Sequence, residues 1–239
     1  MAVFNSLTFD GENSLDYGIY ITGEGVYDAP RRAVEMVTIP GRNGTLAIDQ
    51  GRFENIDVKY AAGSFGSTQG EYAGRMKAFR NMLASRHNYV RLEDDYHPDE
   101  FRLGLYKSGL EVKPVSMSRA GEFDIIFDCK PQRFLKSGET VITLTGTDTI
   151  TNPTLFDSKP LLVVTGRGNI TINGVQIAIS ATPTTIDCEL MEAYNGTTSR
   201  NSDIVLTPNE FPTLAPGENT ITLGSGITKL EITPRWWRI

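Results

Sequence analysis

The chain has 239 residues, of which 39% are hydrophobic and 22% are charged, as in soluble proteins with one large domain or two ordinary ones. No apolar run approaches the roughly 20 residues of a membrane helix, and the first residues lack the basic and apolar regions of a secretory signal, so we expect neither membrane insertion nor export. The formal net charge of −6 repels phosphate backbones, so we expect no direct nucleic-acid recognition.

Side chains for redox, metal and hydrolytic chemistry are scarce. Cys129 and Cys188 lack a paired spacing and are interpreted as buried reduced thiols, with a disulfide as the open alternative. His87 and His97 belong to no metal or nucleophile motif. The acidic run at residues 93–100 is interpreted as a solvated loop, with weak calcium binding as the alternative. We therefore expect no enzyme, no catalytic residue, no metal site and no cofactor.

A hairpin is predicted over residues 34–49. Its centre contains Asn43-Gly44, the strongest signal for a two-residue β-turn. With these two residues as the loop, the register pairs Arg42 with Thr45. The two arms of the hairpin are expected at residues 34–39 and 45–49, with residues 40–44 between them.

The same hairpin has the features of an edge that extends beyond its sheet. Pro40 lacks a backbone N–H and Gly41 has no side chain to pack, so neither suits a central strand. The predicted register also pairs Ile39 with Ile48. An extended edge in a soluble protein is capped, charged or paired with another chain. Residues 41–44 are interpreted as a turn rather than as an anion-binding nest.

One amphipathic helix is predicted over residues 69–86. Thr68 is a suitable N-cap, and Glu71, three residues later, completes the pattern of a capping box. The helix places four apolar residues on one face, which we expect to pack on a sheet: Tyr72, Met76, Phe79 and Leu83. Strands are expected on both sides of the helix, at residues 56–60, 89–92, 101–106 and 122–127.

The composition changes near residue 137. Five threonines and 17 Lys and Arg residues precede residue 138, whereas twenty threonines and six Lys and Arg residues follow. Threonine alternating with Ile, Leu and Val is typical of β-sheets. We predict two β-rich domains, at residues 1–136 and 137–239, with a hinge at residues 135–139.

Hairpin signals dominate the second domain. Asn173-Gly174 separates two alternating runs and pairs their apolar residues, Ile172 with Val175 and Ile170 with Ile177. Residues 219–223 and 227–233 are interpreted as a second hairpin, and the apolar run 161–164 as a strand buried on both faces. No long helix is expected after residue 137. The pattern predicts a β-sandwich of jelly-roll type.

Two adjacent tryptophans lie close to the end of the sequence. On a strand, Trp236 and Trp237 point to opposite faces, so one can pack in the core while the other faces outward. The simpler interpretation is that both cover the end of the sandwich. The alternative is contact with a neighbouring subunit.

Seven short motifs occur in an order that is familiar from one family. They lie at residues 5–11 (NSLTFDG), 35–44 (EMVTIPGRNG), 51–55 (GRFEN), 127–134 (FDCKPQRF), 150–154 (ITNPT), 211–219 (FPTLAPGEN) and 233–236 (TPRW). Together they cover essentially the whole chain. In this respect the sequence resembles the distal tail protein (Dit) family of long-tailed, non-contractile phages.

The resemblance implies a mainly β fold with one α-helix in the N-terminal domain. It implies a β-sandwich at residues 1–136 with a protruding "belt" hairpin, which would correspond to residues 34–49. It also implies a galectin-like, jelly-roll β-sandwich at residues 137–239. Members form a hexameric ring at the tip of the tail tube, and many belong to phages of Gram-positive hosts.

A structural role in the virion follows from this resemblance. The expected partners are further copies of the chain, the tail tube protein and the tail-tip or receptor-binding proteins, and synthesis is expected in the host cytoplasm. We expect the ring interface to use the belt and its surroundings, at Arg31, Ile39, Pro40, Gly41, Arg42, Asn43, Gly44, Arg52 and Phe53.

The alternative function is a carbohydrate-binding adhesin that acts through the C-terminal sandwich. Such a module needs an exposed aromatic platform, and the candidates are Trp237, Tyr194 and Phe211. Sugar-binding galectins also use a strand histidine, and residues 138–239 contain none. The resemblance therefore extends to the topology and gives no support to lectin activity.

Overall fold

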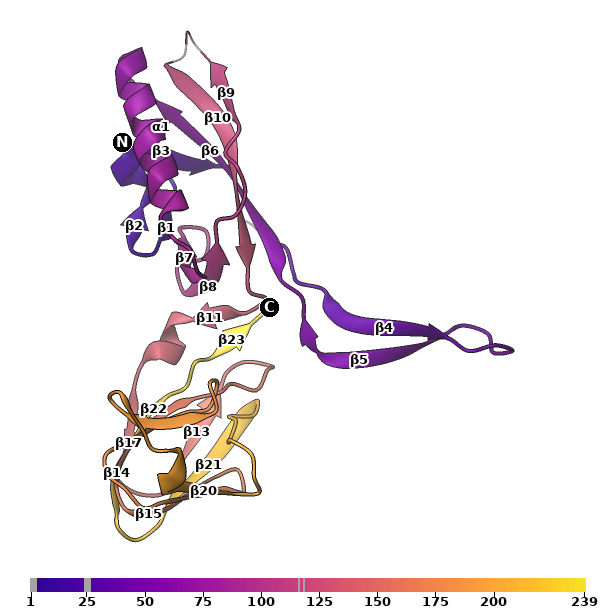
Figure 1. The fold of residues 1–239 in the computed structure, drawn as a ribbon, viewed down its shortest axis with the longest axis vertical. Helices are drawn as coiled ribbons and strands as arrows, with labels where there is room; N and C mark the ends of the chain where they lie inside the picture. Colours follow the sequence, from indigo (N-terminus) through magenta and orange to yellow (C-terminus); the bar gives the residue numbers. More distant parts are fainter. Residues whose placement is uncertain (1–3, 24–26, 116, 118) are drawn as a thin grey trace. The chain divides into compact units, whose positions relative to one another are not determined.

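The structure, a computed structural model, describes residues 4–23, 27–115, 117 and 119–239. The chain divides into two compact units, one of Met1–Arg133 with Ile239 and the other of Phe134–Arg238. Strands dominate both units, and the one α-helix in the described residues lies in the first (Figure 1).

In the first unit, seven strands follow one hydrogen-bonded path in the order β2-β1-β7-β8-β10-β6-β3, and β9 pairs with the other end of β10. Strands β8 and β10 share only two residue pairs, so the sheet is weakly joined there. The elements are β1 (Leu7–Phe9), β2 (Glu12–Asn13), β3 (Ile19–Thr22), β4 (Arg32–Thr38), β5 (Thr45–Phe53), β6 (Ile56–Phe65), α1 (Gln69–Ala84), β7 (Val90–Asp94), β8 (Glu100–Leu105), β9 (Val112–Val115) and β10 (Ala120–Cys129).

The core of this unit lies between helix α1 and two parts of the sheet, one with β1 and β7 and the other with β10 and β6. The ring of Phe9, on β1, lies 4.9 Å from that of Phe127, on β10. The ring of Phe79, on α1, lies 6.5 Å from that of Phe123, also on β10. All four rings are buried, so strands far apart along the sheet share one apolar interior.

The helix begins as its sequence predicts. Thr68 Oγ1 accepts a hydrogen bond from the Glu71 N–H at 3.1 Å, while the Glu71 carboxylate accepts one from the Ser67 N–H at 2.8 Å. The reciprocal bond of the capping box therefore reaches one residue further back than expected. Ser85 Oγ donates to the Met82 carbonyl, and the helix ends at Ala84. The four predicted apolar residues are buried, as is Met82.

The second unit contains two sheets, with strand orders β12-β22-β14-β17-β18-β19 and β13-β21-β15-β16-β20. Their apolar faces share one core, which includes Leu162, Ile177, Leu230 and Trp236. The strands are β11 (Arg133–Leu135, at the boundary), β12 (Ile142–Leu144), β13 (Asp148–Asn152), β14 (Leu161–Gly166), β15 (Gly168–Ile172), β16 (Val175–Ile179), β17 (Thr184–Asp187), β18 (Glu192–Asn195), β19 (Thr198–Ser199), β20 (Ile204–Thr207), β21 (Gly217–Leu223), β22 (Ile227–Thr233) and β23 (Trp237–Arg238).

The predicted Asn-Gly hairpin of this unit is confirmed. Asn173 and Gly174 both have positive φ angles, 49° and 88°, as a type I′ turn requires. The register pairs Ile172 with Val175, and Ile170 with Ile177, as the alternation of apolar residues predicts.

The second predicted hairpin is wrong, because β21 and β22 belong to different sheets. The chain changes sheet at residues 224–226, and it makes the opposite change at residues 166–168, between β14 and β15. The two bends touch backbone to backbone. A Cβ atom on Gly166 would lie 2.2 Å from the Gly226 carbonyl oxygen, and one on Gly226 would lie 2.2 Å from that of Arg167. Alternation of residue types gives the buried face of each strand, but it does not distinguish a hairpin from a change of sheet.

Two further expectations concern buried side chains. Strand β14 buries Leu162 and Val164 but leaves Leu161 and Val163 half-exposed, so the prediction of a strand buried on both faces is wrong. Cys129 and Cys188 are free and buried, which confirms the reduced thiols. Burial raises the pKa of each thiol to about 12, so both are poor nucleophiles.

The two tryptophans differ in their surroundings, although only Trp237 lies on a strand, β23. Trp236 is 5% exposed and packs in the core of the second unit. Trp237 is half-exposed and stacks on Phe156, with ring centroids 4.5 Å apart, while its Nε1–H donates to the Asp157 carbonyl at 2.9 Å. Within the described ranges, no helix is long and apolar enough to cross a membrane.

Candidate functional site: an exposed two-stranded arm

Strands β4 and β5 form a sheet of their own, which we call the arm (residues 32–53). In the described parts of the chain, neither strand pairs with any third strand, so both outer edges carry unpaired backbone groups. Figure 1 shows the arm extending away from the strands that it joins, β3 and β6. Free edges of this length favour pairing or packing with another chain.

The turn of the arm is longer than predicted. Thr38 pairs with Thr45, so six residues form the loop and the expected pairings of Arg42 with Thr45 and of Ile39 with Ile48 are wrong. The Arg42 N–H donates to the Ile39 carbonyl at 3.2 Å.

Local conformation explains the longer loop. Pro40 and Gly41 (φ +78°) hold the second and third positions of the turn closed by that bond, where a type II turn prefers them. Asn43 does not have the positive φ that a type I′ turn requires of its first central residue. The register differs by four residues, an even number, so every side chain keeps its expected face.

Both faces of the arm expose apolar side chains, together with Glu35 on one face and Thr38, Thr45 and Asp49 on the other. Paired residues share a face, so Val34, Met36 and Ala47 lie on one side, and Val37, Leu46 and Ile48 on the other. The exposed fractions are 38% for Val34, 59% for Met36, 43% for Leu46 and 45% for Ile48. A two-stranded ribbon is marginally stable alone in water, and exposed apolar surface of this kind typically marks an interface.

Charged groups fix the conformation of the base of the arm, where β4 begins and β5 ends. Asp49 accepts a hydrogen bond from the Gly51 N–H at 2.9 Å and pairs with the Arg32 guanidinium. The first contact and then the second hold the pKa of this exposed carboxyl below its usual value. The same guanidinium lies over the Phe53 ring, 5.1 Å from its centroid. A register shift between Arg32 and Val34 marks a bulge here.

The predicted interface residues lie along the arm but do not form one cluster. Arg42 lies in the loop, whereas Arg31, Arg52 and Phe53 lie at the opposite end. The sequence prediction omitted the apolar residues of the strands. The signal for them was present in the alternation of Val34 with Met36 and of Leu46 with Ile48.

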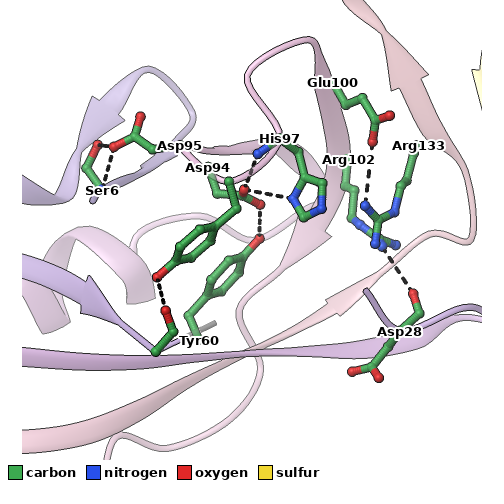
Figure 2. Close-up of polar contacts among 11 residues, drawn as sticks. Ser6, Asp28, Tyr60, Asp94, Asp95, His97, Glu100, Arg102 and Arg133 are labelled. Carbon is green, nitrogen blue, oxygen red and sulfur yellow. Dashed lines mark hydrogen bonds and ion pairs between the residues drawn. The ribbon is translucent and has the colours of Figure 1, made fainter. Parts of the chain in front are cut away.

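The segment that enters the arm is held by β8 and the loop before it. The Tyr27 ring lies edge-on to that of His97, with centroids 5.5 Å apart. The Asp28 carbonyl accepts a hydrogen bond from Arg102 Nη2 at 3.5 Å (Figure 2). Arg102 is 6% exposed, and burial, with the nearby charge of Arg133, lowers its pKa.

His97 belongs to a buried polar cluster, shown in Figure 2. Asp94 lies 2.9 Å from His97 Nδ1 and accepts a 2.7 Å hydrogen bond from the Tyr60 hydroxyl, while Glu100 pairs with Arg133 at 3.5 Å. Burial, then the charge of Asp94, raises the pKa of Tyr60. The expectation of a solvated acidic loop is wrong for Asp94 and Glu100, whose side chains are 10% and 4% exposed.

This cluster offers little room for chemistry. The cavity that His97, Glu100, Arg102 and Arg133 help to line has a volume of about 10 Å³, the space of one water molecule. Across the described residues, no three side chains of the metal-ligating types are grouped as a site. The cluster therefore fits a structural role, since it holds the entry of the arm.

The segment that leaves the arm is held by a second polar network. Asn55 Nδ2 donates to the Tyr89 hydroxyl and to Asp128 Oδ1, both at 2.7 Å, and Lys107 pairs with the same carboxylate. Partial burial opposes ionisation of Asp128, but hydrogen bonds from Lys107, Tyr89 and Asn55 hold its pKa below the usual value. Both ends of the arm are therefore anchored to the body of the unit.

The residues suggested for a glycan platform are engaged separately. Trp237 stacks on Phe156, Phe211 packs against the core of the second unit, and Tyr194 is half-buried on β18. Nothing in these positions favours the adhesin alternative.

The sequence matches no protein-family model and no curated protein. A solved structure of SPP1 Dit (gp 19.1), described as a paradigm of the hub adsorption apparatus in phages that infect Gram-positive hosts, aligns with a TM-score of 0.76 and 13% identity over 99% of this chain and 100% of that one. The chain has the fold of SPP1 Dit. Two structures of the activated phage P2 baseplate, with Ca and with Sr, cover 96% and 99% of the chain at 12% and 11% identity, each with a TM-score of 0.48.

The match to SPP1 Dit confirms the fold class that the motifs implied. It covers both β-rich units and the arm, although about seven residues in eight differ between the two chains. At this identity the similarity concerns the fold, and the arm's role requires its own argument.

Proposed function

We propose that this chain is a distal tail protein of a long-tailed phage, a structural component that assembles into a ring. The observation that carries the proposal is the arm, which exposes apolar side chains on both faces, pairs with no third strand among the described residues and is anchored at both ends. Such a segment gains stability when a neighbouring molecule covers it. The fold of SPP1 Dit, whose description places that protein in a hub adsorption apparatus, supports this role.

A ring requires two different surfaces on each subunit, because head-to-tail contacts close only when one patch meets another. The arm supplies one surface, and its predicted interface residues, including Arg31, Arg42 and Arg52, would meet carboxylates of the neighbour. We propose six subunits, in keeping with the family that the motifs resemble. The proposed ring-forming domain is residues 1–136.

In this proposal the ring links the tail tube protein to the tail-tip or receptor-binding proteins. Residues 137–239 would form a separate sandwich that is free to contact those proteins. The protein would reside in the virion after synthesis in the host cytoplasm, without binding nucleic acid or membrane directly.

The mass of the purified full-length chain in solution tests the proposal. We expect particles of about six times 26.4 kDa, with ring-shaped images in negative stain. A variant in which a short Gly-Ser linker replaces residues 32–53 should remain a monomer, because the arm is absent. The far-ultraviolet circular dichroism of both proteins is the control for folding. Rings of normal size from the armless variant, or a wild-type chain that stays monomeric at high concentration, would contradict the proposal.

A further inference from the structure

Three asparagines of this chain are followed by glycine: Asn43, Asn173 and Asn195. In such a pair the main-chain nitrogen of the glycine can attack the side-chain amide carbon of the asparagine, because glycine has no side chain to obstruct the approach. The attack closes a five-membered ring, so the asparagine must rotate about its Cα–C bond out of the ψ ranges of regular strands and turns. Hydrogen bonds and strand pairing therefore decide which of the three asparagines can react.

The side chain of Asn173 is held by three hydrogen bonds. Its Nδ2 donates to Asn219 Oδ1 at 2.6 Å and to the Thr213 carbonyl at 3.2 Å, and its Oδ1 accepts from the Thr220 N–H at 3.2 Å. Asn219 is itself completely buried. The attack would break these bonds and would also distort the turn that sets the register of β15 with β16. The structure therefore protects this position.

Asn195 is restrained by its main chain. It is the last residue of β18 and pairs with Thr198, which begins β19. Gly196, with a φ of +59°, and Thr197 form the turn between them. A rotation of Asn195 about its Cα–C bond would misdirect the chain at this turn and break the pairing of the two strands. We expect this position to react slowly, although its side chain is exposed.

Asn43 has neither kind of restraint. It is exposed in the loop at the end of the arm, outside the last strand pair, Thr38 with Thr45 (Figure 1). Across the described parts of the chain, its side-chain amide forms no hydrogen bond. A Cβ atom added to Gly44 would meet nothing within 4 Å, so the space around the dipeptide is open. Rotation at this position breaks neither a side-chain bond nor a strand pair.

We propose that Asn43 is a site of spontaneous covalent modification, at which the chain deamidates without the help of another enzyme. The Gly44 nitrogen attacks Asn43 Cγ, a new N–Cγ bond replaces the Cγ–Nδ2 bond, and the amide leaves as ammonia with the proton from the glycine nitrogen. Water then adds to one of the two carbonyl groups of the cyclic imide. The product is an aspartate where the new bond breaks, or an isoaspartate where the original peptide bond breaks.

The reaction changes the charge and the geometry of the loop. Arg42 is the one charged residue of residues 39–44, so a carboxylate beside it lowers the formal charge of the loop from +1 to zero. The isoaspartate form also inserts one additional carbon into the main chain. The proposed function places this loop against a neighbouring copy, and on that proposal, which the reaction itself does not require, aged protein assembles less readily than fresh protein.

Peptide mapping by mass spectrometry tests the selectivity. The full-length chain is incubated at 37 °C and pH 8, below the concentration of assembly, and the replacement of amide by acid is followed at each Asn-Gly pair. In the folded chain, Asn43 should react about tenfold faster or more than Asn173 and Asn195, which corresponds to about 1.4 kcal/mol in the barrier. In urea the three rates should become similar, because the protecting contacts are lost. Similar rates in the folded chain, or a faster reaction at either protected position, would overturn the proposal.

Asn43→Gln is the matched variant, because glutamine keeps the amide but would have to close a six-membered ring, which forms far more slowly. An enzyme that methylates isoaspartate should label the incubated wild type strongly and this variant at most weakly. Far-ultraviolet circular dichroism checks that both proteins remain folded during incubation. Equal labelling of the two proteins would place the reaction elsewhere in the chain and contradict the proposal.

Assembly of fresh and incubated protein separates this inference from the proposed function. Incubated wild type should need a concentration about threefold higher or more to form rings, whereas Asn43→Gln should assemble equally well before and after incubation. If wild type modified at Asn43 assembles as fresh protein does, the loop lies outside the ring interface, and the modification site stands. If the wild type forms no ring at all, the proposed function fails, and the peptide map alone decides the modification site.

Discussion

Two Asn-Gly dipeptides of this chain, one in the arm and one between β15 and β16, give different turns. Between β15 and β16, Asn173-Gly174 forms a two-residue turn, while in the arm Asn43-Gly44 ends a loop of six residues. Strand β15 is a central strand, and the side chain of Asn173 is itself bonded to Asn219 at 2.6 Å. The arm has no such neighbours, so the preferences of Pro40 and Gly41 decide its turn. A local turn signal is therefore most reliable where a sheet supports it.

The largest expected contrast between the second unit and the arm is in the stability lost when a leucine is replaced by alanine. Leu162→Ala, in the core of the second unit, should lower the free energy of unfolding by about 2–5 kcal/mol through lost burial and a cavity. Leu46→Ala, in the arm, should change it by less than about 0.5 kcal/mol in the monomer. Urea denaturation of both variants at a concentration below assembly measures the difference. A comparable loss for Leu46→Ala would show that the arm is part of a monomer core.

A smaller contrast is expected between Asp187, in the second unit, and Asp49, in the arm, whose carboxyl pKa values are both lowered. Asp187 is 4% exposed. Burial opposes its ionisation, but two bonds from Arg235 and those from the Leu190 and Glu189 N–H groups hold its pKa below the usual value. Because the folded pKa is the lower one, this stabilisation is present above the unfolded value of about 4 and is lost as the pH falls through the folded value.

The pH dependence of unfolding therefore distinguishes the two carboxylates. Asp187→Asn should remove about 1–3 kcal/mol at pH 7 and flatten the loss of stability on acidification. Asp49→Asn, in the exposed base of the arm, is the comparison and should change the profile much less than Asp187→Asn does, because solvent screens its contacts. Urea denaturation between pH 3 and 7 makes the comparison. A profile for Asp187→Asn that retains the wild-type slope would contradict this role.

The smallest contrast is between the two turn asparagines. Asn173→Ala should cost about 1–2 kcal/mol, because alanine is strained at a φ of +49° and the bonds to Asn219 and Thr220 are lost. Asn43→Ala should cost less than about 0.5 kcal/mol, since this residue does not require a positive φ. Thermal unfolding of the two variants provides the test, and equal losses would refute the contrast.

Much of the fold could be predicted from residue patterns alone. The apolar face and N-cap of α1 and the register of β15 and β16 follow from local rules, because period, cap and turn agree in each case. The separation of β21 from β22 could not be predicted. It depends on contact between bends near Gly166 and Gly226, sixty residues apart in the sequence.

The candidate site was only partly predictable. Pro40 and Gly41 identified the arm as an edge, but its register depended on the φ of Asn43, which no residue pattern reveals. The burial of Glu100 depends on Arg133, contributed from another part of the chain. Alternation in the arm marks apolar residues on two faces, but only the exposure of Val34, Met36, Leu46 and Ile48 in the structure shows that neither face is covered.

The paired bends at Gly166 and Gly226 also limit how the second unit can change during evolution. At this corner main chain lies directly against main chain, so even a methyl group would force the sheets apart. Chains that share this architecture should therefore keep glycine at both bends long after other resemblance has faded.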